Sequence, residues 1–107
     1  LFRDEEVHIA EHEGTICGFA SVYPPATFLH HLYVRPNSQR IGLGRALLSR
    51  CLERYGHDLS LKCNLRNLQA GRFYRRSGFR AVEIGRGEDG VWQLMRRDPR
   101  FRTEPQQ

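Results

Sequence analysis

The first third of the chain alternates between apolar and polar residues, a pattern of period two that is typical of half-buried strands. Residues 7–13 (VHIAEHE) and 15–23 (TICGFASVY) both follow it, and the turn signal at Gly14 predicts that they form a hairpin. A pair of prolines then interrupts the alternation. Residues 26–34 (ATFLHHLYV) are more apolar and predict a third, more central strand.

After residues 35–40, whose composition is typical of a loop, the period changes to that of a helix. Leu43, Leu47 and Cys51 are spaced by four, which predicts a broad apolar stripe on a helix over residues 42–55. The remainder predicts a strand, a second helix and a final hairpin around a glycine-rich turn. The expected ranges are 59–63, 67–77, 79–84 and 91–95, with the turn at 85–90.

This order of elements, β-β-β-α-β-α-β-β, predicts an α/β fold with a mixed sheet of the α+β kind. Strands that alternate with helices need crossovers, and the flanking hairpins add antiparallel strands. The 107 residues are the size of one small domain. We expect one folded domain over residues 1–97 and a flexible C-terminal tail over residues 98–107, which contain two prolines and end in a pair of glutamines.

Composition excludes several classes of protein. Hydrophobic residues make up 39% of the chain, and no apolar run approaches the roughly 20 residues that span a bilayer, so no membrane partner is expected. Cys17, Cys51 and Cys63 are odd in number and lack CxxC spacing, which argues against a disulfide framework and a zinc site. We therefore expect no metal, and free thiols buried in the reducing cytoplasm.

The charge of the chain is basic, with 17 Lys and Arg against 12 Asp and Glu and a formal net charge of +5. A basic surface attracts polyanions, which include nucleic acids, anionic membranes and phosphorylated cofactors. Charge alone does not choose among these partners.

A short glycine turn joins the third predicted strand to the first predicted helix. A helix N-terminus offers unpaired N–H groups and a partial positive charge, and Gly42 and Gly44 remove side chains that would keep a phosphate away. Arg40 and Arg45 add full positive charge. The segment lacks both the GK[ST] ending of a Walker P-loop and the third glycine of a dinucleotide fingerprint. A pyrophosphate cradle and a plain tight turn are both compatible with this fragment alone.

A longer match surrounds the turn. Residues 34–48 (VRPNSQRIGLGRALL) resemble motif A of the GCN5-related N-acetyltransferase (GNAT) family, a V-x-P strand end followed by [RQ]-x-x-G-x-[GA] and an apolar helix. Residues 67–79 resemble a later motif of the same family, N-x-x-A-x-x-x-Y-x-x-x-G-F, in the expected order. The resemblance implies the acyl-CoA N-acyltransferase fold, here expected without its first strand and first two helices, which usually line the acceptor side.

The resemblance implies that acetyl-CoA is the cosubstrate and that its acetyl group passes to an amine by direct attack in a ternary complex. It assigns the pyrophosphate to the backbone of the glycine turn and the pantetheine to the preceding strand. It gives Tyr74 the role of protonating the departing thiolate, although helical spacing alone also fits a core tyrosine. The cofactor-binding residues expected from it are Leu32, Tyr33, Val34, Gln39, Arg40, Ile41, Gly42, Leu43, Gly44, Arg45 and Asn67. Asn67 would either contact the pantetheine or fix the start of its helix.

The general base is expected first at His31 and second at His30, because a neutral imidazole suits proton removal near pH 7. More remote candidates are His8, His12 and Glu11. His30 and His31 are adjacent on one predicted strand, so their side chains are expected on opposite faces, His31 together with Leu29 and Tyr33. A β-bulge would reverse this assignment. The alternative for each histidine is a polar strand residue that faces solvent.

Two other functions stay open. One is a non-catalytic domain of the same fold that binds acetyl-CoA as a ligand. The other is a basic nucleic-acid-binding module, suggested by the arginines and by Phe73 and Tyr74, although the chain lacks the interleaved aromatic-basic strand of an RNA-recognition motif. The acceptor is open among small amines, amino acids, antibiotics, polyamines and protein N-termini, and a homodimer is a further open partner.

Overall fold

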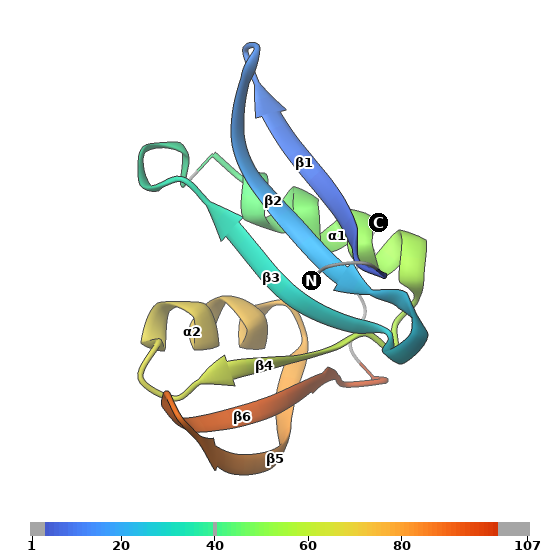
Figure 1. The fold of residues 1–107 in the computed structure, drawn as a ribbon, viewed down its shortest axis with the longest axis vertical. Coiled ribbons are helices and arrows are strands. Elements are labelled where there is room, and N and C mark those ends of the chain that lie inside the picture. The colour runs from blue at the N-terminus through green and yellow to red at the C-terminus, as the bar shows by residue number, and fades with distance from the viewer. Residues whose placement is uncertain (1–3, 40, 101–107) are drawn as a thin grey trace. The chain divides into compact units, whose positions relative to one another are not determined.

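The structure is a computed structural model that describes residues 4–39 and 41–100. The chain forms two compact units that divide between Leu59 and Ser60, and each is described by itself. The helices and strands of both are labelled in Figure 1.

The first unit begins with three antiparallel strands in the order β1-β2-β3, which are β1 (Glu6–His12), β2 (Thr15–Tyr23) and β3 (Phe28–Val34). The predicted turn at Gly14 is confirmed, since Glu13 and Gly14 have φ values of 53° and 79°. Both values are positive, as a tight two-residue hairpin turn requires. The two prolines form a short 3₁₀ turn, Pro24–Ala26, and delay the start of β3 to Phe28, two residues later than predicted.

A β-bulge interrupts the pairing of β2 with β3. Ser21 pairs with His31, but Val22 pairs with Leu29, so His30 is an extra residue on β3. The expected alternation along this strand is therefore wrong at this point. Leu29 is buried in the core, whereas His30 and His31 are both exposed, so His31 does not share a face with Leu29.

Helix α1 (Leu43–Tyr55) follows a 3₁₀ turn at Pro36–Ser38 and covers one face of the three strands (Figure 1). Its predicted apolar stripe is buried at Leu47, Leu48 and Cys51. The facing strand residues include Ala20 and Val22, both fully buried, so small and β-branched side chains let the helix approach the sheet. Gly56 ends the helix, as predicted, with its N–H bonded to the Leu52 carbonyl oxygen.

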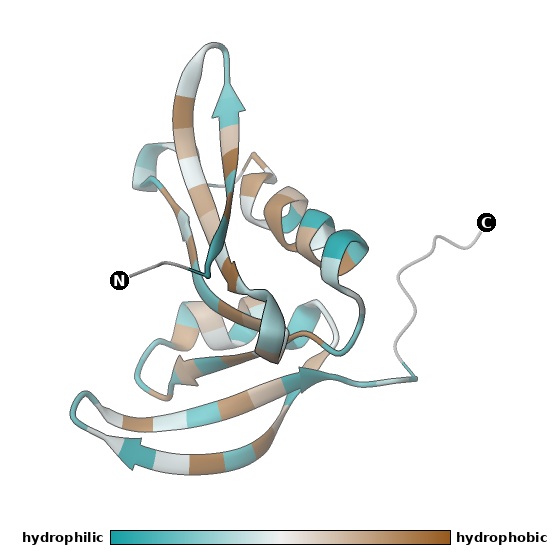
Figure 2. Ribbon diagram, turned by 45° about the vertical axis from the view of Figure 1, so that its right-hand side comes forward, coloured by the Kyte–Doolittle hydropathy of each residue, from teal (hydrophilic) through white to brown (hydrophobic). Residues whose placement is uncertain are grey.

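The second unit contains β4 (Ser60–Asn64), α2 (Leu68–Arg76), β5 (Phe79–Gly87) and β6 (Gly90–Arg97), with antiparallel strands in the order β4-β6-β5. Its core is formed by the fully buried side chains of Leu61, Phe79 and Met95. Apolar and polar segments alternate along the hairpin of β5 and β6 (Figure 2). The predicted strand and helix at the start of this unit are confirmed to within one residue at each end.

The final hairpin is longer than predicted. The glycine-rich segment 85–90 was expected to be the turn, but β5 continues through it to Gly87, which pairs with Gly90 across a two-residue turn. Gly85 belongs to the strand because the Trp92 ring lies where its side chain would start, 2.1 Å from an ideal Cβ position. The glycine therefore accommodates an aromatic ring instead of a change of direction.

The segment after β6 is held to the second unit at its beginning. The N–H of Asp98 donates to the Gly78 carbonyl oxygen at 2.7 Å, and the Asp98 carboxylate binds the Arg100 guanidinium. The rest of the predicted tail, residues 101–107, lies outside the described residues. Within residues 4–39 and 41–100, no helix has the length and apolar character needed to cross a membrane.

Candidate active site

The start of α1 leaves backbone N–H groups available to a ligand. The first intrahelical bond is donated by the N–H of Ala46 to the carbonyl oxygen of Gly42, so the N–H groups of Leu43, Gly44 and Arg45 precede the i→i−4 pattern. Among the described residues, no side chain caps this end and no acidic residue lies in the first turn. Such an end attracts anions because the helix dipole adds to the exposed donors.

Gly42 gives this turn its shape. It has φ 85° and ψ 9°, a left-handed conformation that side chains disfavour. No described atom lies within 4 Å of the position where a Gly42 side chain would begin. Ile41 and Arg45 are exposed beside it, and Arg40, which was expected to add charge here, lies outside the described residues. The turn is thus open on the side of its glycine.

The turn is connected to the end of β3 by a side chain. Nε2 of Gln39 donates to the carbonyl oxygen of Val34 at 2.9 Å. Gln39 was expected to contact the cofactor, and the structure gives it a bond that fixes the loop between β3 and α1. The loop therefore has a defined path between the strand and the helix that the sequence assigned to the cofactor.

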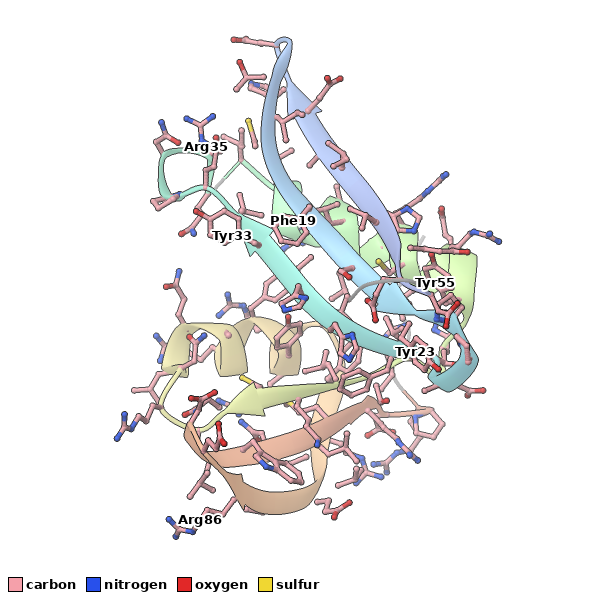
Figure 3. All side chains as sticks on the ribbon, viewed as in Figure 1. Phe19, Tyr23, Tyr33, Arg35, Tyr55 and Arg86 are labelled. Atoms are coloured by element: carbon pink, nitrogen blue, oxygen red, sulfur yellow. The ribbon has the colours of Figure 1, made fainter. Side chains whose placement is uncertain are left out.

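The residues of β3 that we expect to bind pantetheine are paired with residues of β2. Leu32, Tyr33 and Val34 lie opposite Ala20, Phe19 and Gly18, respectively. A Cβ atom on Gly18 would lie 2.4 Å from the Tyr33 carbonyl oxygen, so only glycine permits this approach of the two strands. The Phe19 and Tyr33 rings lie side by side with centroids 6.1 Å apart (Figure 3).

The second motif lies in the second unit, whereas the glycine turn and β3 belong to the first. Asn67 is the N-cap of α2, and its Oδ1 accepts a hydrogen bond from the N–H of Ala70 at 3.1 Å. Of the two roles that the resemblance allowed for Asn67, this is the one that fixes the start of the helix. Tyr74 is buried, with its ring edge-on to Phe73 and Phe79 at centroid distances of 5.2 and 6.0 Å.

The two candidate bases lie together at the bulge of β3. The centroids of the His30 and His31 rings are 6.0 Å apart. Nδ1 of His30 lies 2.6 Å from Oε2 of Glu5, whose other oxygen accepts a 2.6 Å hydrogen bond from the Ser21 hydroxyl. His31 contacts the ring of Phe19.

A comparison with known families decides what the two motifs belong to. The family described as acetyltransferase (GNAT) domain matches residues 2–96, which include both motifs and span both units. The chain belongs to the GNAT family. The resemblance noted in the sequence is therefore confirmed.

Two curated proteins that resemble this GNAT chain are each 34% identical to it. One, over 90 residues and 79% of this chain, is the 5-NmdU N-acetyltransferase of Pseudomonas phage PaMx11. The other, over 83 residues and 78% of this chain, is a peptidyl-lysine N-acetyltransferase of Escherichia coli. The chain spans 64% and 51% of the lengths of these two relatives, respectively.

Solved structures confirm the predicted GNAT fold. A GNAT-family protein from Desulfovibrio desulfuricans has a TM-score of 0.74 and 26% identity, over 87% of this chain and 68% of that one. The ribosomal-protein-S18-alanine N-acetyltransferase from Escherichia coli has a TM-score of 0.70 and 26% identity, over 86% and 67%. A GNAT-family acetyltransferase from Elizabethkingia anophelis with acetyl-CoA bound shares the fold at a TM-score of 0.79 and 16% identity, over 90% and 77%.

The sequence gives no sign that Glu5 and Ser21 lie beside the candidate base His30. Glu5 precedes the first predicted strand, and its partners Ser21 and His30 are 16 and 25 residues away along the chain. No short motif links residues at such separations. The signal that could have found them is chemical, since a buried carboxylate needs hydrogen-bond donors and a histidine and a serine are available on the adjacent strands.

Burial keeps two thiols of this chain protonated near neutral pH. Burial raises the pKa of Cys51 to about 11, against a smaller opposing effect of Arg50. Burial also raises the pKa of Cys63. All three cysteines are free and buried, as predicted. Within the described part of the chain, no group of three or more His, Cys, Asp or Glu residues is arranged to hold a metal ion.

Proposed function

We propose that this chain is the acetyl-CoA-binding part of an N-acetyltransferase, which passes the acetyl group directly to an amine in a ternary complex. The observation that supports this most is the start of α1, where a left-handed Gly42 precedes N–H groups that no described side chain caps. An uncapped, glycine-lined helix start suits a pyrophosphate. Family membership and the names of the relatives agree with it.

In this proposal, acetyl-CoA lies along the end of β3 and the turn that follows. The backbone N–H groups at the start of α1, from Leu43 to Arg45, hold its pyrophosphate, and the backbone of Leu32, Tyr33 and Val34 binds the pantetheine amides. Two solved structures of the same fold support the choice of ligand, since they contain acetyl-CoA: the Elizabethkingia anophelis acetyltransferase and a streptothricin acetyltransferase from Bacillus anthracis.

The reaction requires three groups from the protein: a donor to the oxyanion, a proton donor for the thiolate and a base for the amine. A neutral amine attacks the thioester carbonyl carbon, and the resulting oxyanion needs a preorganised donor, which we assign to a backbone N–H near Leu32 or Tyr33. The carbon–sulfur bond then breaks, and the CoA thiolate takes a proton from Tyr74. The nitrogen loses a proton to a base, so the products are the acetylated amine and CoA thiol. The raised pKa values of Cys51 and Cys63 support direct transfer, because a protonated thiol is a poor nucleophile.

The acceptor is an amine in this proposal. The named relatives act on chemically different acceptors, 5-NmdU and peptidyl-lysine, and the structural neighbours include an enzyme named for the alanine of a ribosomal protein. What these proteins share is acetylation at nitrogen. Three buried, unpaired thiols support a reducing compartment such as the cytoplasm for this activity.

The experiment that tests the proposal measures stability and turnover on the same preparation. Acetyl-CoA at 100 times its dissociation constant should add about 2.7 kcal/mol to the free energy of unfolding and raise the Tm. Acetylation should then be followed by mass spectrometry with an alanine-starting peptide, an N-terminally blocked lysine peptide and a polyamine.

Each alternative gives a different result in this experiment. Stabilisation by acetyl-CoA without acetylation of any of these amines would identify a non-catalytic acetyl-CoA-binding domain. No stabilisation by acetyl-CoA, together with affinity for DNA or RNA that falls steeply with salt, would identify a nucleic-acid-binding module.

A further inference from the structure

Three side chains from separate segments contact one another beside β3, the strand that contains the candidate bases. Glu5 precedes β1, Ser21 lies on β2 and His30 lies on β3, and the Glu5 carboxylate is 2.6 Å from each of the other two. The Glu5 side chain is 6% exposed, whereas the His30 side chain is 42% exposed. The buried Glu5 carboxylate thus holds Nδ1 of His30, while part of the His30 side chain is exposed.

The hydrogen-bond partners determine which nitrogen of His30 has the proton. Desolvation raises the pKa of Glu5, but the hydrogen bonds from Ser21 and His30 outweigh it and the pKa is lowered from its usual value. Glu5 is therefore a carboxylate at neutral pH, and a carboxylate only accepts hydrogen bonds. Nδ1 of His30 must donate, so in the neutral ring the free lone pair is on Nε2.

The bulge explains why His30, and not His31, has this partner. As the extra residue opposite Ser21 and Val22, His30 is displaced from the regular alternation of β3. Its ring stands edge-on to Phe28 at 5.0 Å and is stacked with Tyr23 at 6.3 Å between centroids. Two aromatic rings and one carboxylate thus restrict the orientation of the imidazole, as a base with a fixed direction requires.

We propose that Glu5 is a positioning residue that holds His30 in the Nδ1–H tautomer, so that Nε2 of His30 takes the proton from the acceptor amine. This inference rests on the proposed N-acetyltransferase activity. His30 is two residues before Leu32 on the same strand, about 7 Å along it. The base is therefore close to the backbone assigned to the pantetheine. The proton moves from the amine nitrogen to Nε2 and then to solvent, while Glu5 stays ionised and stabilises the transient imidazolium.

An alternative explanation is that Glu5 only fastens the segment before β1 to the sheet. The neighbouring residue offers a matched control for this, because Glu6 accepts a hydrogen bond from Tyr55 and pairs with Arg54 on α1, away from His30. Glu5→Ala and Glu6→Ala each remove one carboxylate that ties the start of β1 to other elements of the first unit. Ser21→Ala is a second control, since it removes the other partner of Glu5 and leaves the bond to His30.

The first readout is the tautomer of His30, measured on the full chain by long-range ¹⁵N–¹H correlation of the imidazole. Wild type, Glu6→Ala and Ser21→Ala should show a proton on Nδ1, and Glu5→Ala should lose this preference. An Nε2–H tautomer in the wild type would overturn the proposal, whatever the activity. Among the described residues of this unit, the titratable groups that face His30 are Glu5, Tyr23 and His31, so a His31→Ala spectrum is needed to assign the signals.

The second readout is kinetic. Glu5→Ala should lower kcat/KM by about 10- to 100-fold, the usual effect of losing the partner that orients a histidine, with acetyl-CoA affinity unchanged. Glu6→Ala should leave kcat/KM within a factor of two or so of wild type once both are folded. Adding Glu5→Ala to His30→Ala should have no further effect, because Glu5 acts only through His30.

The outcomes separate this inference from the proposed function. If the wild type acetylates an amine but the effects of Glu5→Ala and His30→Ala multiply, Glu5 does not act through His30 and the inference fails while the function stands. If Glu5→Ala and Glu6→Ala lower kcat/KM equally, Glu5 is an anchor only. If the wild type acetylates no amine, the proposed function and the inference fail together.

Discussion

The two helices of this protein begin in opposite ways. Helix α1 starts after a left-handed Gly42, and no described side chain caps it. Helix α2 starts at Asn67, whose side chain accepts the hydrogen bond of the Ala70 N–H. One set of helix-terminal N–H groups is thus available to an external anion, and the other is partly satisfied by the protein's own side chain.

This contrast separates a helix start that can bind an anion from one that has only a structural role. Replacing asparagine at an N-cap by alanine costs about 1 kcal/mol, whereas replacing it by glycine costs only a few tenths of a kcal/mol. A chain that uses glycine at such a position therefore loses little local stability and leaves the backbone accessible. We therefore propose ligand binding at the start of α1, and a contribution of α2 through the side chains along its length.

The largest effect should come from the chemistry proposed for α2. Tyr74→Phe should lower kcat by about 10- to 1000-fold, because the thiolate loses its proton donor and solvent substitutes only in part. The affinity for acetyl-CoA should change little, since binding is assigned to α1. Steady-state kinetics at saturating substrate, with the dissociation constant measured separately, check this. An unchanged kcat would make Tyr74 a core residue packed against Phe73 and Phe79.

The next effect concerns the cap of α2. Asn67→Ala should lower the free energy of unfolding by about 1 kcal/mol, because the Ala70 N–H loses its partner. Urea denaturation measures this change. Acetyl-CoA affinity should stay close to that of the wild type. A variant with normal stability and weakened acetyl-CoA binding would show instead that Asn67 contacts the pantetheine.

A smaller effect should appear at the C-terminal end of α1. Side-chain hydrogen bonds hold this end to β1, whereas no described side chain caps the start of the helix. The Tyr55 hydroxyl donates to Glu6 and lies 2.7 Å from Nε2 of His8. Burial, followed by the Glu6 hydrogen bond, raises the pKa of Tyr55 to about 12. An unfolded tyrosine loses its proton near pH 10, so the folded state binds more protons between about pH 10 and 12 and stability falls as pH rises through this window.

Tyr55→Phe should reduce this alkaline loss of stability, because the replacement has no proton to lose. Thermal unfolding between pH 9 and 11 measures the slope for both proteins. Equal slopes in the variant and the wild type would contradict the assignment of the raised pKa to Tyr55. The other two tyrosines outside α2, Tyr23 and Tyr33, remain in both proteins and serve as the internal reference.

The smallest effect is expected from the thiols. Replacing Cys17, Cys51 and Cys63 by Ala one at a time, in variants that remain folded, should leave a ternary-complex rate law intact. Cys51 is fully buried and its raised pKa keeps it protonated, so it is not suited to attack acetyl-CoA. Initial rates at several concentrations of both substrates decide the matter. A ping-pong pattern that one replacement abolishes would indicate an acetyl-cysteine intermediate.

Much of this fold could be predicted because its signals are local. The apolar spacing of α1, the cap at Asn67 and the turn at Gly14 each depend on residues close together in the chain. The predicted β5–β6 hairpin was too short, because a glycine at position 85 is typical of a turn. Its actual role depends on the Trp92 ring that lies against it. What makes this glycine a strand residue is a contact across the sheet, which periodicity does not show.

The signals of the candidate site divide in the same way. The two motifs, the first of which contains the glycine turn, are continuous in sequence, so the family they belong to could be predicted from them. A β-bulge on this strand was allowed for, but its position at His30 was not predictable, because period-two alternation does not reveal an extra residue on one strand. Glu5 was missed because its role depends on Ser21 and His30, which only the antiparallel pairing of three strands brings to it.

Calorimetric titration of acetyl-CoA into wild type, Gly44→Val and Asn67→Ala tests whether the start of α1 binds the cosubstrate. Wild type and Asn67→Ala should bind with similar affinity, while Gly44→Val should bind about 100-fold more weakly, because a valine side chain keeps the pyrophosphate from the N–H groups at the start of α1. Circular dichroism confirms that each variant is folded. A folded Gly44→Val variant that binds acetyl-CoA as tightly as the wild type would contradict the account.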